Sequence, residues 1–278
     1  MAAGFVIDEN PAFGDTYDAP TMKNAVTTSL RLVLPLALSL GVAFEPGNHA
    51  NAFEEPVHLS LTIWLAVSAG FPEADAFQLG RFDQATDDDP DTSPMPALAV
   101  QQRRRYHAFG GSSAVDTLKS EAHCTRDAIT PLEFKRIGQF LHALEDLYSH
   151  RCCGPILGQL IIGEGPDKPW YAPPVFVAMV ERKFEELLKL RRGCNSASFS
   201  EQAVRVDFAR AKSRLDAWAQ DAYEFSAEDP NNAARWDALA RGLYGVNYVK
   251  YTDTFVKAYH ASQQSPGVPS APSSPTIR

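Results

Sequence analysis

Residues 131–150 read PLEFKRIGQFLHALEDLYSH, and this stretch is the clearest indication of the fold class. Pro131 stands where the first turn of a helix accepts proline, and Thr130 before it is a candidate N-cap. We therefore predict a helix that begins at Pro131 and ends before Gly154. Apolar residues recur along one side of it at the steps of three and four that a helix requires. They are Phe134, Ile137, Phe140, Leu141, Leu144, Leu147 and Tyr148.

The same helical period recurs through the chain. Residues 59–69 and 73–82 are predicted as two helices, separated by Gly70 and Pro72 because both residue types break helices. Runs of alternating residues bounded by hairpin turns are missing, so the predicted fold is all-α, a single helical bundle. Further helices are predicted over residues 175–188, 204–222 and 234–259.

Composition narrows the class of protein. The chain has 278 residues, 45% of them hydrophobic and 22% charged, which is typical of a globular protein and excludes disorder, collagen and coiled coils for most of it. The net charge of −8 argues against binding of nucleic acid through a broad positively charged surface. The four cysteines are too few for a disulfide scaffold and lack the spacing of a zinc ribbon. They therefore do not indicate whether the protein resides in an oxidising or a reducing compartment. They are Cys124, Cys152, Cys153 and Cys194.

The two ends differ from the middle. Residues 1–55 form an N-terminal extension whose apolar run, residues 32–44, is predicted as a core helix; the alternative is a late export signal or a membrane-touching segment. Residues 56–262 are predicted to form the helical domain. Residues 263–278 are predicted to be a disordered Pro- and Ser-rich tail or linker, which could tether the domain to a partner or to a membrane-active delivery system. With no standard signal peptide, we expect a cytoplasmic protein or export by another route.

His142, Asp146 and His150 follow one another at steps of four residues and share one stripe of the predicted helix. Imidazoles and a carboxylate one turn apart are the ligands that zinc-like ions require. The alternative is a solvated polar face, although such faces usually consist of Lys, Glu and Arg. One helix cannot complete a site, and the candidates for further ligands are His58, Asp83, Asp87, Asp88 and His107.

Taken in order, these residues form a motif series over residues 57–154, about a third of the chain. The series resembles the helical zinc-dependent phospholipase C and S1/P1 nuclease superfamily, and is most similar to its bacterial and fungal branch with the HxxxDxxSH helix. The motifs are His58-x-x-Leu61-Thr62, Leu65-Ala66, Ala69-Gly70-Phe71, Asp75-Ala76, Gln84-x-x-Asp87-Asp88, Tyr106-His107 and Leu141-His142-x-x-x-Asp146-x-x-Ser149-His150 with Gly154.

The resemblance implies a helical bundle around two or three zinc ions, with phosphate esters as substrates. By that resemblance His142 and Asp146 would be ligands, with Asp146 a candidate bridge between ions. Asp87 and His107 would complete the shell of the first ion, and His58 would serve a neighbouring ion. His150 would be a ligand or would support one.

Two departures from the superfamily reduce the expected number of ions. Members use an N-terminal Trp as a ligand, whereas 57 residues precede His58 here and none of them is Trp. Members also carry a later His-x-x-x-Glu pair, whereas the only histidine after His150 is His260, which lacks that partner. We therefore expect one or two Zn²⁺ ions.

If the site is catalytic, an ion with an open position would activate water. Asp83 or Asp88 could hold that water as a general base, and Arg105 and Arg151 could face a bound phosphate. The alternative for each arginine is a basic surface turn. The substrate would be a phospholipid, with transient membrane contact, or a nucleic acid.

A second function from a different class stays open. The metal could hold the bundle together in a non-catalytic module that acts as an interaction or effector domain. The missing N-terminal Trp and the missing second His/Glu pair favour this alternative.

Overall fold

The computed structural model describes residues 56–94, 100–109, 111–124, 128–150, 168–194, 199–223 and 231–244, with residues 257, 259 and 261. All of them lie in one compact unit, residues 49–278. The predictions for the extension 1–55, for Arg151, for Cys152 and Cys153 and for the tail 263–278 fall outside the described residues.

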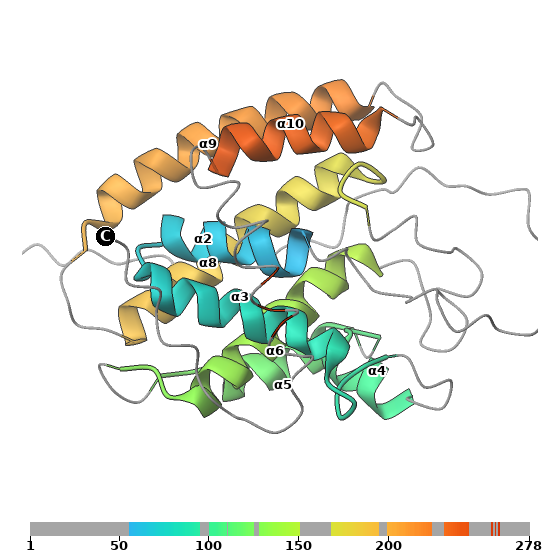
Figure 1. Ribbon diagram of the computed structural model, residues 1–278, viewed down its shortest axis with the longest axis vertical. Coiled ribbons are helices and arrows are strands. Elements are labelled where there is room, and N and C mark those ends of the chain that lie inside the picture. Colours follow the sequence, from blue (N-terminus) through green and yellow to red (C-terminus); the bar gives the residue numbers. More distant parts are fainter. Residues whose placement is uncertain are drawn as a thin grey trace, which may run out of the picture. The chain divides into compact units, whose positions relative to one another are not determined.

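Every described element is a helix, which confirms the all-α class (Figure 1). A π-helical turn, η1 (Pro56–Leu61), carries His58 and leads into α2 (Thr62–Ser68). Single π turns of this kind are frequent at functional sites. The other helices are α3 (Glu73–Asp88), α4 (Val100–Tyr106), α5 (Ser112–Glu121), α6 (Pro131–Ser149), α8 (Pro173–Cys194), α9 (Glu201–Tyr223) and α10 (Asn232–Tyr244).

One predicted helix ends at a different residue, and two of the described helices were not predicted. α3 continues past residue 82 to Asp88, so Asp87 and Asp88 lie in its last turn and not after it. The apolar period misses this turn because its inward side chains include the polar Asp83, Gln84 and Asp87. α4 and α5 were not predicted. α10 covers the start of the predicted helix 234–259, and residues 245–256 fall outside the described residues.

The start of α6 agrees with its prediction. The side-chain oxygen of Thr130 accepts a hydrogen bond from the backbone N–H of Glu133 at 3.3 Å. The Glu133 carboxylate accepts one from the backbone N–H of Thr130 at 2.8 Å. This reciprocal pair is a capping box, with Pro131 in the first turn.

α3 lies between α2 and α6 (Figure 1), and it packs against both of them and against η1. Two glycines permit this close approach. A Cβ on Gly138 of α6 would lie 2.5 Å from the backbone carbon of Phe82. A Cβ on Gly80 would lie 2.7 Å from the carbonyl oxygen of Leu59. The carboxylates of α3 are therefore brought close to His58 on one side and to α6 on the other.

A disulfide joins Cys124, which follows α5, to Cys194 at the end of α8 across a sequence separation of 70 residues. Spacing alone does not predict this pair, because α5 and α8 are far apart in the chain. Disulfides persist mainly in oxidising compartments.

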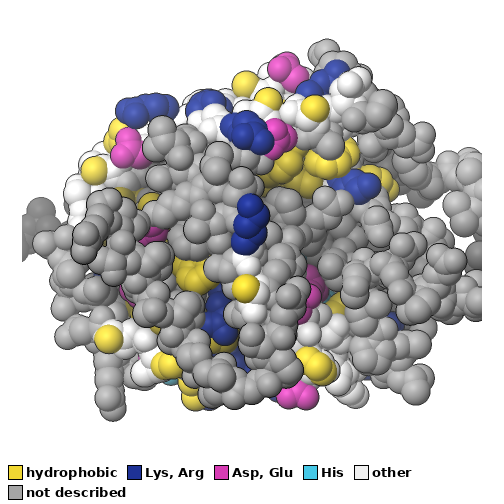
Figure 2. Space-filling view, in the orientation of Figure 1, with side chains coloured by type: hydrophobic (Ala, Val, Ile, Leu, Met, Phe, Trp, Pro, Cys, Tyr) yellow, Lys and Arg dark blue, Asp and Glu magenta, His cyan; other side chains and the backbone are white. Residues whose placement is uncertain are grey.

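The described surface carries mixed charge. On the face shown in Figure 2, Lys and Arg side chains stand apart from one another, with acidic side chains between several of them. Ion pairs at the surface of the described helices include Arg192 with Glu201 and Lys212 with Asp216. Among the described helices, none is both long and apolar enough to cross a membrane.

Candidate metal centre

Four segments far apart in the sequence bring their acidic and imidazole side chains to one place in the core. η1 contributes His58, α3 contributes Asp83 and Asp87, the turn after α4 contributes His107, and α6 contributes His142 and Asp146. The side chains of all six are 0% exposed. The alternative of a solvated polar face is therefore wrong for His142 and Asp146.

Three imidazole nitrogens face the carboxylates of Asp87 and Asp146. His142 Nε2 lies 3.4 Å from Asp87 Oδ1 and 3.3 Å from Asp146 Oδ2. His107 Nδ1 lies 3.6 Å and 3.1 Å from the same two oxygens. His58 Nε2 lies 3.8 Å from the other oxygen of each carboxylate. We call these five residues the histidine–aspartate centre.

The far nitrogen of each imidazole contacts a group outside this centre. His107 Nε2–H donates to the carbonyl oxygen of Thr92 at 2.9 Å. His58 Nδ1–H donates to Glu145 Oε2 at 2.6 Å. His142 Nδ1 lies 3.3 Å from Asp83 Oδ1. A far nitrogen that carries the proton leaves the near nitrogen of a neutral ring with its lone pair toward the carboxylates, as a metal ligand requires.

The donor atoms fit a cation. Neither carboxylate oxygen of Asp87, nor Asp146 Oδ1, accepts a hydrogen bond from any residue that the structure describes, although all three oxygens are buried. Buried carboxylates without a partner are costly, and a bound cation is one way to satisfy them. Two donors about 2.1 Å from one ion, at angles of roughly 90–130°, lie about 3.0–3.8 Å apart. The spacings in the centre fall in this range, so the buried His/Asp cluster could hold a metal ion.

Beside the centre lies a second group, which we call the lysine network: Thr62, Asp83, Glu145 and Lys183. Lys183 Nζ donates to Asp83 Oδ2 at 2.8 Å and also donates to Glu145 Oε1 and to Thr62 Oγ1. Thr62 Oγ1 donates to Asp83 Oδ2 at 2.7 Å. The Lys183 side chain is 0% exposed, so its charge is stabilised by these contacts alone.

The pKa values of His58 and His142 are both raised by the buried carboxylates around them. Burial and the neighbouring His142 lower the pKa of His58. Glu145 and Asp83 outweigh both and raise that pKa to about 10. Burial also lowers the pKa of His142, but Asp146 and Asp87 raise it well above its usual range. Imidazolium rings at His58 and His142 therefore balance the charge of the buried carboxylates.

The pKa values of Asp146, in the histidine–aspartate centre, and Glu145, in the lysine network, are shifted in opposite directions. Burial raises the pKa of Asp146, but His142 and His107 hold it well below its usual range. Burial and then Asp83 raise the pKa of Glu145, with Lys183 acting in the opposite direction. Asp146 is thus the more strongly acidic of the two neighbours on α6.

The remaining predicted site residues lie at different places. His150 caps the end of α6 with its ring stacked on Phe109 at 4.8 Å, and burial lowers its pKa so that the ring is neutral. Asp88 is exposed and accepts a hydrogen bond from the hydroxyl of Tyr259. Arg105 is exposed and pairs with Glu121 at 3.0 Å. The structure thus places Asp83 beside the histidine–aspartate centre, but not Asp88 or Arg105, and Arg151 lies outside the described residues.

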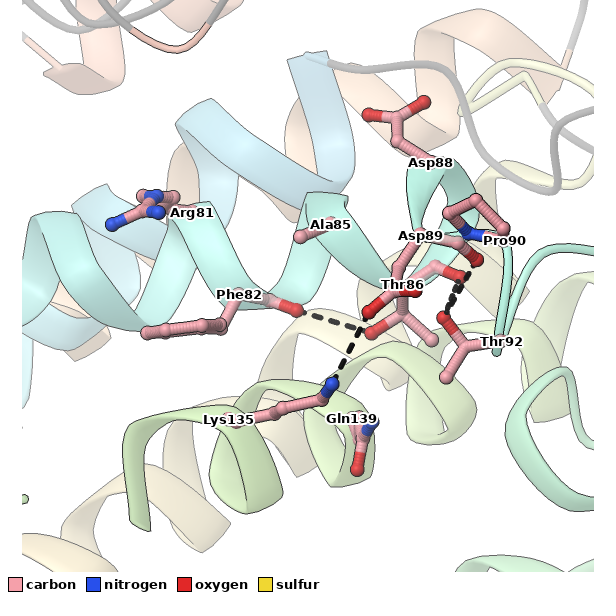
Figure 3. Close-up of a pocket in the computed structure, with 10 residues that line it drawn as sticks. All are labelled: Arg81, Phe82, Ala85, Thr86, Asp88, Asp89, Pro90, Thr92, Lys135 and Gln139. Carbon is pink, nitrogen blue, oxygen red and sulfur yellow. Dashed lines mark hydrogen bonds and ion pairs between the residues drawn. The ribbon is translucent and has the colours of Figure 1, made fainter. Parts of the chain in front are cut away.

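A cavity of about 250 Å³ lies between the C-terminal half of α3 and the start of α6 (Figure 3). Its lining includes Asp88, Arg81 and Lys135, and Lys135 pairs with Asp89 at 3.1 Å. Thr92 also lines it, and the carbonyl of Thr92 is the one that holds His107. Thr92 therefore connects the cavity wall to the histidine–aspartate centre.

The sequence reasoning missed Glu145, Lys183 and Thr62. Glu145 lies three residues after His142, so helical spacing places it on the same side of α6. Lys183 stands among the apolar positions of α8, between Val180 and Phe184, both of which are buried. A lysine within an apolar stripe was the available signal, because such a residue needs a buried partner.

No protein-family model, no curated protein and no solved structure matches this chain. The resemblance to the phospholipase C and nuclease superfamily rests on the motifs alone.

Proposed function

We propose that this protein is a metal-dependent phosphoesterase that holds one or two zinc ions in the histidine–aspartate centre. The observation that carries the proposal is the convergence of three imidazole nitrogens on the two carboxylates of Asp87 and Asp146. His107 and His142 would hold one ion with one oxygen of each carboxylate. His58 and the remaining two oxygens would hold its neighbour.

The donor set favours chemistry at the His58 position. A structural zinc ion takes four protein ligands, whereas a catalytic one has three and an open position. His58 with the two outer carboxylate oxygens supplies three donors. When bound, such an ion supplies Lewis acidity toward a phosphoryl oxygen and toward water. Asp87 and Asp146 would bridge the two positions.

The surrounding residues have supporting roles in this proposal. Thr92, Glu145 and Asp83 orient the three imidazoles, which fixes the direction of their lone pairs. Substrate would approach from the cavity beside Thr92, where Arg81 and Lys135 offer positive charge to a phosphate.

The test compares wild-type protein, Asp146→Asn and the control His123→Ala, since His123 is an exposed histidine outside the centre. Each is purified without chelators and assayed for zinc and for hydrolysis of bis(4-nitrophenyl) phosphate, phosphatidylcholine vesicles and single-stranded DNA. We expect Asp146→Asn to lose zinc and at least about 100-fold in kcat/KM, as for other lost metal ligands and their supports. His123→Ala should retain both. An unchanged rate in Asp146→Asn would exclude the catalytic role.

One observation favours the non-catalytic alternative: every side chain of the centre is fully buried. A metal that only holds the bundle together would have such surroundings. In that case zinc removal would lower the melting temperature sharply while none of the three substrates is turned over. Activity, and not stability, separates the two functions, because a catalytic metal stabilises the fold as well.

A further inference from the structure

We propose that Lys183 is a built-in cation that takes the place of an additional metal ion beside the centre. Asp83 and Glu145 would then orient His58 and His142 and would not bind metal themselves. This inference rests on the metal binding of the proposed function, and it concerns the part of the cluster that the centre does not use.

The geometry around Lys183 carries the inference. An ammonium group has three N–H donors, and three buried oxygens accept from Lys183 Nζ: Thr62 Oγ1, Asp83 Oδ2 and Glu145 Oε1. Two carboxylate oxygens and a hydroxyl are also the ligands that a hard metal cation prefers. The ammonium therefore stands where these oxygens would otherwise hold such an ion.

His58 and His142 already use their Nε2 atoms for the histidine–aspartate centre. His58, Asp83 and His142 lie close enough together to form a metal-binding triad of their own. An ion there would need the Nδ1 lone pairs of both histidines, because Asp83 Oδ1 lies 3.3 Å from each Nδ1. The Nε2 atoms of the same rings face Asp87 and Asp146. A neutral imidazole has one lone pair, so serving the centre through Nε2 leaves a proton on Nδ1.

The acceptor oxygens of the lysine network are divided between Lys183 and the two histidines. Glu145 accepts from His58 Nδ1–H through Oε2 and from Lys183 Nζ through Oε1. Asp83 accepts from Lys183 Nζ through Oδ2, and its Oδ1 lies 3.3 Å from the Nδ1 atoms of both His58 and His142. The ammonium thus offsets one of the two buried carboxylate charges, and the Nδ1–H groups face the remaining oxygens.

The experiment counts bound ions by elemental analysis and follows melting temperature in Zn²⁺ and in Mn²⁺. Lys183→Ala removes the ammonium and leaves space, whereas the matched Lys183→Met removes the charge and fills the space. In the absence of metal we expect both to melt about 10 °C below wild type, since one partner of a buried ion pair is lost. Lys183→Ala should bind one ion more than wild type and recover stability in Mn²⁺, and Lys183→Met should do neither.

A second comparison applies even if neither Lys183 variant folds. Asp83→Asn should keep the wild-type ion count at saturating Zn²⁺, whereas Asp87→Asn should lose at least one ion. An ion lost in Asp83→Asn would overturn the inference, as would an unchanged count in folded Lys183→Ala. No bound ion in wild-type protein would instead remove the proposed function, and this inference with it.

Discussion

His107 Nδ1 lies 3.1 Å from His142 Nε2, although 35 residues separate the two in the chain. His107 donates its other ring proton to Thr92, so its Nδ1 has no proton when the ring is neutral. Two imidazole nitrogens that close, facing the same pair of carboxylate oxygens, need either a proton or a metal ion between them.

Metal binding should release protons. Because the pKa of His58 is raised to about 10 and that of His142 well above its usual range, both rings are protonated in the metal-free protein at pH 7. His142 would serve one ion and His58 its neighbour, so filling both positions must displace about two protons, one for each ion. The affinity for each ion should therefore rise by up to about 10-fold per pH unit between pH 7 and 9. Calorimetric titration of Zn²⁺ in buffers of different ionisation enthalpy measures the proton count. If almost no protons are released when zinc binds, the prediction is wrong.

The stability of the metal-free protein should change with pH in the opposite sense. The folded-state pKa of His58 lies above the ordinary value of 6.5, so its stabilising contribution is fully present below about pH 6.5 and is lost as the pH rises through about 10. Urea unfolding of protein treated with a chelator should therefore show that the free energy of unfolding decreases from pH 7 to pH 10. Zinc-loaded protein, in which the rings are neutral, should show a smaller fall over this range.

Gly138→Ala should disturb the approach of α3 to α6. The added Cβ would meet the backbone of Phe82 and Asp83 at 2.5–2.7 Å, and backbone cannot move aside as a side chain can. We expect a loss of about 1–3 kcal/mol in the free energy of unfolding, and weaker zinc binding because Asp83 and Asp87 lie on the displaced helix.

Gly193→Ala is the matched control for Gly138→Ala. A Cβ at Gly193 of α8 would meet no atom within 4 Å, so alanine there should be neutral or stabilising by up to about 1 kcal/mol. Equal destabilisation by both substitutions would show that close helix packing is not the cause.

The double variant Cys124→Ser/Cys194→Ser should lower the free energy of unfolding by about 2–4 kcal/mol, because the disulfide closes a separation of 70 residues and restricts the unfolded chain. Chemical denaturation with and without a reductant measures the effect. Wild-type protein should be sensitive to the reductant and the variant insensitive, while both keep their zinc. A stable variant that has lost zinc would mean that the disulfide supports the centre and not the chain as a whole.

The sequence by itself determined the fold class and named the five residues that meet in the histidine–aspartate centre. Helical periodicity and the capping box at Thr130 and Glu133 are local properties, so α6 followed from residues close together in the chain. His142 and Asp146 share a face of α6 for the same reason. His58, Asp87 and His107 were predicted as ligands from their residue types and from the resemblance to the phospholipase C and nuclease superfamily. Their spacing in the chain could not show that they converge.

Only the tertiary structure decided which groups surround the centre. Lys183 lies 100 residues from Asp83 and 38 from Glu145, and no local pattern relates an inward lysine on α8 to carboxylates on α3 and α6. Helical period places a side chain on a face, whereas the close approach of α3 at Gly80 and Gly138 decides which faces meet. Burial then decides the chemistry, because carboxylates shielded from water must find a proton, an ammonium group or a metal ion.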